Sequence, residues 1–135
     1  MSNKILVIGQ APSARKQEYP YDSTQFYDWL EELDISKEQA QELFIFDSVY
    51  NHFPGFKQGG GHLVPTQEQM DSHWSELSDN ILHASKVLVF GNVAKDYLIS
   101  KGFTDFEFLM HPSKLNFNLY QKNKEKVLST LKKLL

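Results

Sequence analysis

Four short apolar runs have the length and composition of buried β-strands. They span residues 4–8, 43–46, 87–90 and 106–110. Their near-continuous apolar character is typical of strands that helices cover on both faces, as in parallel sheets. The intervening segments have helical periodicity, so the chain is a series of βα units. We predict an α/β fold, a three-layer α/β/α sandwich with a central, mainly parallel four-stranded sheet.

Helical spacing of apolar residues locates the helices that would cover this sheet. One helical face is shared by Phe26, Trp29, Leu30 and Leu33. Asp22 or Ser23 is expected to cap the amino end of that helix, because short polar side chains accept hydrogen bonds from its first amides. A second face is formed by Met70, Trp74, Leu77 and Ile81. It follows a capping box made by Thr66 and Gln69.

Two further helices are expected after the third and fourth strands. Asn92 opens the first of them, directly after Gly91. The last helix places lysines opposite an apolar face formed by Val127, Leu128, Leu131 and Leu135. Both faces are expected to pack on the sheet.

The segment from Val49 to Pro65 is the least regular part of the chain. It contains Pro54-Gly55 and the triple glycine 59–61. No Gly-Lys-Ser/Thr follows these glycines, so they are not a phosphate-binding P-loop. Long loops are often functional, and we predict a mobile flap here.

Length and composition indicate one globular domain over residues 1–135. The absence of cysteine excludes disulfides, thiolate-bound zinc and iron–sulfur clusters. No signal peptide is recognisable and no apolar run approaches the roughly 20 residues that span a bilayer, so we expect a cytoplasmic, soluble monomer without membrane contact. The histidines show no metal-ligand spacing, and neither a metal nor a cofactor is expected.

Charge is distributed unevenly along the chain. Residues 1–80 carry five Lys or Arg against thirteen Asp or Glu, whereas residues 81–135 carry nine against four. The net charge of −3 argues against strong non-specific binding to nucleic acid. The basic second half is either a local binding face or the solvated side of the final helix.

Two short motifs directly follow strand-like runs. The first is Gly9-Gln10-Ala11-Pro12-Ser13 and the second is His111-Pro112-Ser113. Both would leave the carboxyl ends of strands, the edge where open α/β sheets bind ligands.

These two motifs, together with the order of the segments between them, resemble those of the compact uracil-DNA glycosylases. The resemblance is to the kind of which many members carry an iron–sulfur cluster. The first motif corresponds to the family's Gly-Glu-Ala-Pro-Gly, and the second is its His-Pro-Ser. The intervening matches are Pro20-Tyr21 to Pro-Phe, residues 47–55 to Asn-Val-Val-Lys-Cys-Arg-Pro-Pro-Gly, Pro65-Thr66 to Pro-Thr, and Gly91-Asn92-Val93-Ala94 to Gly-x-x-Ala. The resemblance implies a hydrolase that flips a base out of DNA and cleaves its N-glycosidic bond.

The resemblance also implies roles for single residues. His111 would donate to the oxyanion that develops on the departing base. The base would bind against the backbone of Gly9 and Ala11, with Tyr21 as its aromatic platform. Four residues would contact DNA: Ser13 and Ser113 at phosphates, Lys114 at the backbone, and Leu115 as an apolar wedge in the vacated stack.

Two positions depart from the family pattern. Asp47 replaces the Asn that reads uracil, and an ionised carboxylate cannot both donate to and accept from the uracil edge. It would favour bases that offer donors, or would act as the acid or as the group that positions water. Gln10 replaces a Glu and cannot take a proton, so Asp22, Asp28 or Asp47 would have to orient the attacking water.

Three functions fit these residues. The first is a DNA glycosylase that removes a deaminated or damaged base. The second is a catalytically inactive relative that binds a nucleobase, a nucleotide or single-stranded nucleic acid. The third is a small-molecule nucleotide or nucleoside hydrolase.

Overall fold

The computed structural model describes residues 4–10, 24–52, 54–55, 57–59, 63–109 and 124–135. Within them lies a four-stranded sheet in the order β2-β1-β3-β4, with every neighbouring pair parallel. The strands are β1 (Ile5–Gly9), β2 (Phe44–Ser48), β3 (Lys86–Phe90) and β4 (Glu107–Leu109). The predicted α/β class and all four predicted strands are confirmed, with ends displaced by one or two residues.

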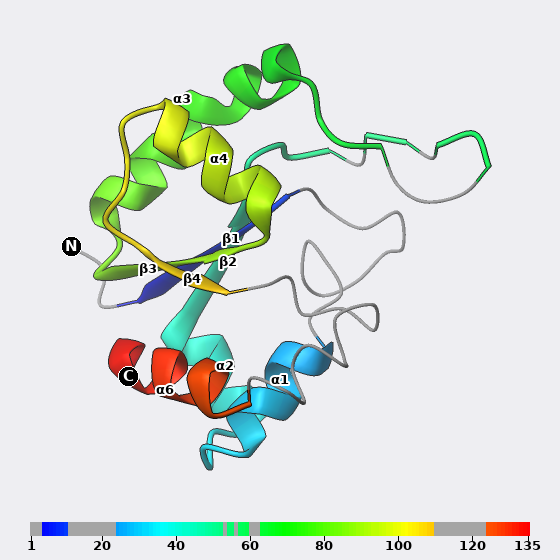
Figure 1. Ribbon diagram of the computed structural model, residues 1–135. Coiled ribbons are helices and arrows are strands. Elements are labelled where there is room, and N and C mark those ends of the chain that lie inside the picture. The colour runs from blue at the N-terminus through cyan, green and yellow to red at the C-terminus, as the bar shows by residue number, and fades with distance from the viewer. Residues whose placement is uncertain (1–3, 11–23, 53, 56, 60–62, 110–123) are drawn as a thin grey trace.

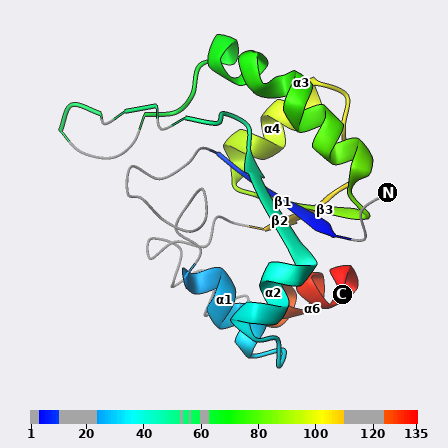
Figure 2. The same cartoon turned by 180° about the vertical axis from the view of Figure 1, so that it is seen from behind.

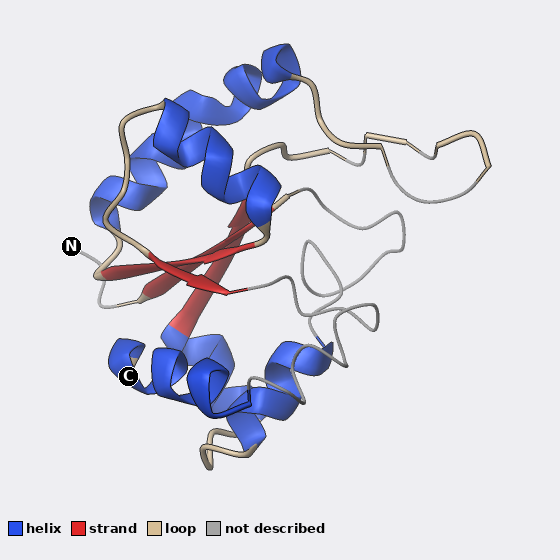
Figure 3. Ribbon diagram, in the orientation of Figure 1, coloured by secondary structure: helices blue, strands red, loops and turns tan. Residues whose placement is uncertain are grey.

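Helices cover both faces of this sheet (Figure 1). They are α1 (Thr24–Glu31), α2 (Lys37–Leu43), α3 (Gln67–His83), α4 (Asn92–Ser100) and α6 (Lys124–Leu134). Figure 3 shows α3 and α4 together above the strands and the other three helices below, and the view from behind in Figure 2 shows the same layers. None of the described helices is long and apolar enough to cross a membrane.

The central strand β1 is buried along its whole length, and its side chains alternate between two cores. Ile5 and Val7 pack in the core between the sheet and α1, α2 and α6, whereas Leu6 and Ile8 pack in the core between the sheet and α3 and α4. This division follows from the two-residue period of a strand. It explains why the strand sequences are apolar at successive positions.

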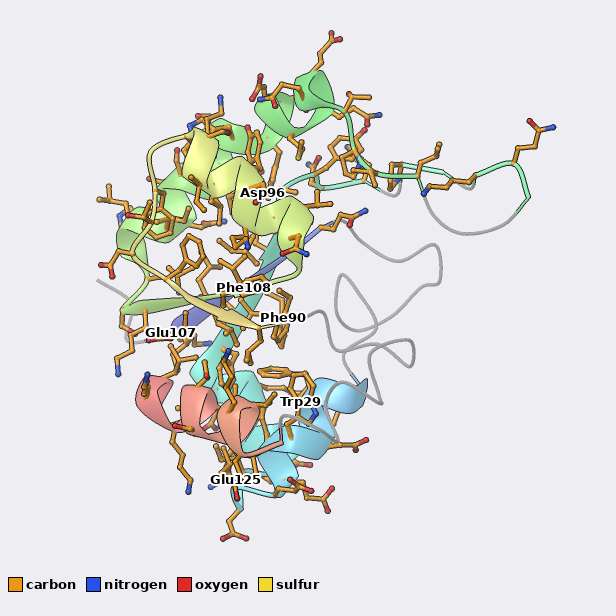
Figure 4. All side chains as sticks on the ribbon, viewed as in Figure 1. Trp29, Phe90, Asp96, Glu107, Phe108 and Glu125 are labelled. Carbon is orange, nitrogen blue, oxygen red and sulfur yellow. The ribbon has the colours of Figure 1, made fainter. Side chains whose placement is uncertain are left out.

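Phe26 of α1 is the centre of the first core and is fully buried. Its ring meets Phe44 of β2 and Phe90 of β3 edge-on, with ring centroids 5.2 and 5.3 Å apart. Trp29 contacts Phe90 in the same way at 6.4 Å, and Figure 4 shows these two side chains on one side of the sheet. Such edge-to-face pairs are favourable beyond the area that they bury. The predicted apolar face of α1 is therefore confirmed.

Capping boxes begin two of the helices. In α3 the Thr66 hydroxyl accepts from the amide of Gln69, whose side chain accepts from the Thr66 amide. This is the predicted box. The equivalent pair Ser36 and Gln39 begins α2, which the apolar pattern did not predict because Ala40 is its one buried residue.

The last helix differs from prediction at its carboxyl end. Val127 and Leu131 are buried and Leu128 packs beside them, as predicted. Leu134 is 5% exposed and Leu135 is 50% exposed, so the prediction that Leu135 belongs to the apolar face was wrong. Leu134 follows Leu131 by three residues and completes the same helical face.

A polar cluster joins α3 to α4. Asp71 Oδ1 accepts from the Tyr97 hydroxyl at 2.7 Å and from Gln67 Nε2 at 3.0 Å, and Lys101 Nζ lies 2.9 Å from it. The Tyr97 hydrogen bond, followed by that of Lys101, lowers the pKa of Asp71 below 3.8. Burial, together with Asp71, raises the pKa of Tyr97.

We predict that Asp71→Asn lowers the free energy of unfolding at neutral pH and that this loss shrinks in acid. The folded-state pKa of Asp71 is lowered, so its contribution is present above pH 3.8 and is lost as the pH falls through the folded value. Urea unfolding of both proteins between pH 7 and pH 2.5 measures the difference. The exposed Asp96 of α4 provides the control Asp96→Asn. A gap between Asp71→Asn and the parent protein that does not depend on pH would contradict this assignment.

Candidate functional site

The parallel sheet brings the ends of the strands that precede both motifs to one edge. Gly9, which begins the first motif, is the last residue of β1, and β4 ends at Leu109, two residues before His111. β3 lies between these strands. Neighbouring strands are about 4.8 Å apart, so the ends of β1 and β4 are separated by about 10 Å. This carboxyl edge is the candidate site.

The ends of β1 and β2 are joined beyond the strands themselves. Gly9 pairs with Ser48 in the parallel register. The Val49 amide donates to Gly9 O at 3.0 Å, and the Tyr50 amide donates to Gln10 O at 3.3 Å. The first two residues of the motif are therefore fixed against the segment that follows β2. Asp47 pairs with Ile8 and lies one residue before this junction.

The Asp47 side chain points from the end of β2 to α3. Its Oδ1 accepts from the Ser48 amide at 2.7 Å and lies 2.9 Å from His73 Nε2, and its Oδ2 accepts from Asn80 Nδ2 at 2.8 Å. The side chain is 12% exposed. Since a carboxylate can accept about four hydrogen bonds, these contacts use most of its capacity. Base reading or water positioning by Asp47 would use the remaining acceptor position on Oδ2.

His73 lies between two carboxylates. Its side chain is 3% exposed, with Nε2 at 2.9 Å from Asp47 and Nδ1 at 3.3 Å from Glu76 Oε2. Glu76 is exposed, one turn further along α3. This arrangement couples the end of β2 to the middle of α3.

Sequence reasoning missed His73 and Asn80 as partners of Asp47. His73 is a buried polar residue on the face of α3 that also buries Met70 and Leu77. Asn80 follows His73 by seven residues, which is two helical turns, so both lie on one side of the helix. A polar pair on an otherwise apolar helical stripe was the signal that could have identified them.

The turn after β3 places the positive amino end of helix α4 at the same edge. Gly91 has a φ of 84°, a conformation that favours glycine, and its amide donates to Leu109 O at 3.0 Å. Helix α4 begins at the next residue, and no side chain caps it. Its first amides and dipole favour negative charge at this edge. Lys95 lies above the Phe108 ring at 4.7 Å, one turn into the helix.

The structure brings together three predicted site residues, Gly9, Gln10 and Asp47, at the β1–β2 junction. Asp28 is exposed on α1, in the opposite layer from α3. The other predicted site residues lie outside the described ranges: Ala11, Ser13, Tyr21, Asp22, His111, Ser113, Lys114 and Leu115. The roles of all the predicted site residues remain predictions.

Two further findings concern other possible binding sites among the described residues. No group of three or more His, Cys, Asp or Glu side chains among them is arranged to hold a metal ion. A cavity of about 290 Å³ lies at the amino ends of β3 and β4, where Lys86, Phe106 and Glu107 line it. It lies at the opposite end of the sheet from the carboxyl edge.

Comparison with known proteins agrees with this architecture. No curated protein matches the chain. Among protein families, the uracil DNA glycosylase superfamily matches residues 2–135, which include both motifs and all four strands. The resemblance carried by the motifs is thereby confirmed at the level of the superfamily. The chain, whose parallel strands lead into both motifs at one edge of the sheet, belongs to the uracil DNA glycosylase superfamily.

Proposed function

We propose that this protein is a DNA N-glycosylase that removes a deaminated or damaged base by hydrolysing its N-glycosidic bond. One observation carries the proposal: in a member of this superfamily, the strands that lead into the two motifs run parallel and end at one edge of the sheet. That topology supplies both loops to a single site.

Breaking an N-glycosidic bond makes two electrostatic demands on such a site. Positive charge develops on the sugar and negative charge on the departing base. In our proposal His111 donates a hydrogen bond to the base. In other enzymes, removal of such a donor raises the activation free energy by about 3 to 4 kcal/mol. The uncapped start of α4, at the same edge of the sheet, adds backbone dipoles whose positive ends also favour negative charge. Carboxylates then stabilise the sugar and orient water.

The base must leave the duplex and enter a pocket before this chemistry. We propose that Gly9 and Ala11 present their backbone to the base and that Tyr21 stacks on it. Contacts to the strand come from Ser13, Ser113 and Lys114, and Leu115 fills the vacated stack. With these contacts the proposed partner is DNA.

Asp47 makes uracil an unfavourable substrate in this proposal. An Asn side chain can donate to and accept from a base, whereas a carboxylate accepts only. Its Oδ2 has an acceptor position beyond the Asn80 contact, and that position suits an amino-bearing base edge or the attacking water. Gln10 stands where the family has a Glu, so Asp47, with Asp22, is the proposed water-orienting carboxylate.

A second candidate is a non-catalytic protein that binds a nucleobase, a nucleotide or a single strand. The observation that favours it is the Asp47 carboxylate, which three donors of the protein already engage. Binding of these ligands without base release would select this function. Release from free nucleosides at a rate insensitive to salt would instead select a small-molecule hydrolase.

We predict that His111→Ala reduces the single-turnover rate of base release by roughly 100-fold to 1,000-fold, because one oxyanion donor is lost. The substrates are labelled single-stranded and mismatched oligonucleotides that carry uracil, hypoxanthine or xanthine. His83→Ala is the matched control, since His83 is exposed near the carboxyl end of α3 and its Nδ1 contacts Asp79 O of the same helix. Equal rates in the two variants would refute the role of His111, and no release by the parent protein would refute the glycosylase proposal.

We predict that Asp47→Asn raises the rate for uracil relative to hypoxanthine by roughly 10-fold to 100-fold, the discrimination that a bidentate hydrogen-bonded pair supplies. The physical reason is that an amide both donates and accepts. Competition between the two substrates in one reaction measures the ratio. Asp28→Asn, which changes an exposed carboxylate on α1, is the control. An unchanged ratio in Asp47→Asn would show that another residue reads the base.

A further inference from the structure

We propose that His73 and Asn80 of α3 are positioning residues that hold the Asp47 carboxylate at the carboxyl edge of the sheet. This inference rests on the proposed function, because Asp47 belongs to the proposed site. His73 and Asn80 act through Asp47.

The contacts define a clamp made by His73 and Asn80. His73 Nε2 lies 2.9 Å from Oδ1, and Asn80 Nδ2 lies 2.8 Å from Oδ2. The two clamp residues are seven positions apart, about 10 Å along the helix axis. Each carboxylate oxygen thus has its own donor, and the donors approach from different turns of one rigid helix. This fixes both the position and the rotation of the carboxylate.

Stability alone gives little reason for this clamp. On this side of the sheet Asp47 lies between Ile45, which is 42% exposed, and the fully buried Val49, and the fully buried Leu77 lies between the two clamp residues along α3. An apolar side chain at position 47 would suit these surroundings. Buried ion pairs are often no more stabilising than the apolar residues that could replace them. The polar set is therefore better explained by the site than by folding.

The clamp is linked directly to the first motif. Asp47 Oδ1 also accepts from the Ser48 amide, and Ser48 pairs with Gly9 across the β1–β2 ladder. The Ser48 hydroxyl donates to Tyr50 O, and the Tyr50 amide donates to Gln10 O. A shift of the carboxylate would thus be transmitted to Gly9 and Gln10. Displacing a reacting group by about 1 Å can cost on the order of 100-fold in rate.

The chemistry of the clamp predicts which substitutions preserve it. His73→Gln keeps an N–H donor that can reach Asp47, whereas His73→Leu has similar bulk and no donor. His83→Leu is the matched control on the same helix, because that ring is exposed and its Nδ1 contacts Asp79 O. Asn80→Ala removes the second donor and provides an independent variant should His73→Leu not fold.

Two measurements test the proposal on the chain of residues 1–135. The first is single-turnover base release from the hypoxanthine oligonucleotide. The second is hydrogen exchange of the Ser48 amide by NMR, which reports the Asp47 contact without requiring activity. We expect release to fall on the order of 100-fold in His73→Leu and about 10-fold in Asn80→Ala, with faster Ser48 exchange in both. His73→Gln should stay within about threefold of the parent protein, as should His83→Leu.

The two measurements separate this proposal from the proposed function. Parent-like Ser48 exchange in folded His73→Leu and in Asn80→Ala would overturn the clamp, whatever the activity. Faster exchange with unchanged release in an active protein would overturn its role in positioning. If the parent protein releases no base, the glycosylase proposal fails and the positioning role falls with it, while Ser48 exchange still decides whether the clamp holds Asp47. Failure of His73→Gln to restore release would also count against the positioning role.

Discussion

Pairing of the central strand β1 with β2 on one side and β3 on the other is the constraint on which the rest of the structure depends. Both pairings are parallel, so the strands end together, and β4 continues the same direction beside β3. Each parallel connection must cross from one end of the sheet to the other, which places helices on its faces. The same constraint gathers four chain segments at the carboxyl edge. A binding edge is therefore a consequence of the topology before any side chain is considered.

Burial of β1 on both faces makes this part of the fold readable from sequence. Its five residues are all buried, and the apolar runs of β2, β3 and β4 identified the other strands. The capping box of Thr66 and Gln69 located α3 because it acts through local hydrogen bonds. Helix α2 lacked a comparable apolar face. Leu135 was misplaced because its periodic position competed with that of Leu134, the buried last residue of α6, and Leu135 lies beyond the end of the helix.

The candidate site was less predictable than the fold. The motifs predicted a site at the carboxyl edge because they directly follow strands, and Gly9, Gln10 and Asp47 lie together at the β1–β2 junction. The partners of Asp47 lie more than 20 residues away in sequence, on α3. Contacts of that kind depend on how a helix rotates over a sheet, which short motifs do not encode. Independently of this geometry, the superfamily match shows that the chain is related to the uracil DNA glycosylases.

The central claim is that the carboxyl edge of the sheet, where the two motifs begin, binds the DNA. Titration of the labelled protein with an oligonucleotide that carries an abasic product site, followed by backbone amide NMR, tests it most directly. We predict shifts at Gly9, Gln10, Ser48 and Gly91, which lie at that edge, with Ser85 and Lys86 at the opposite end unchanged. Shifts confined to the amino edge, or none at saturating oligonucleotide, would contradict it.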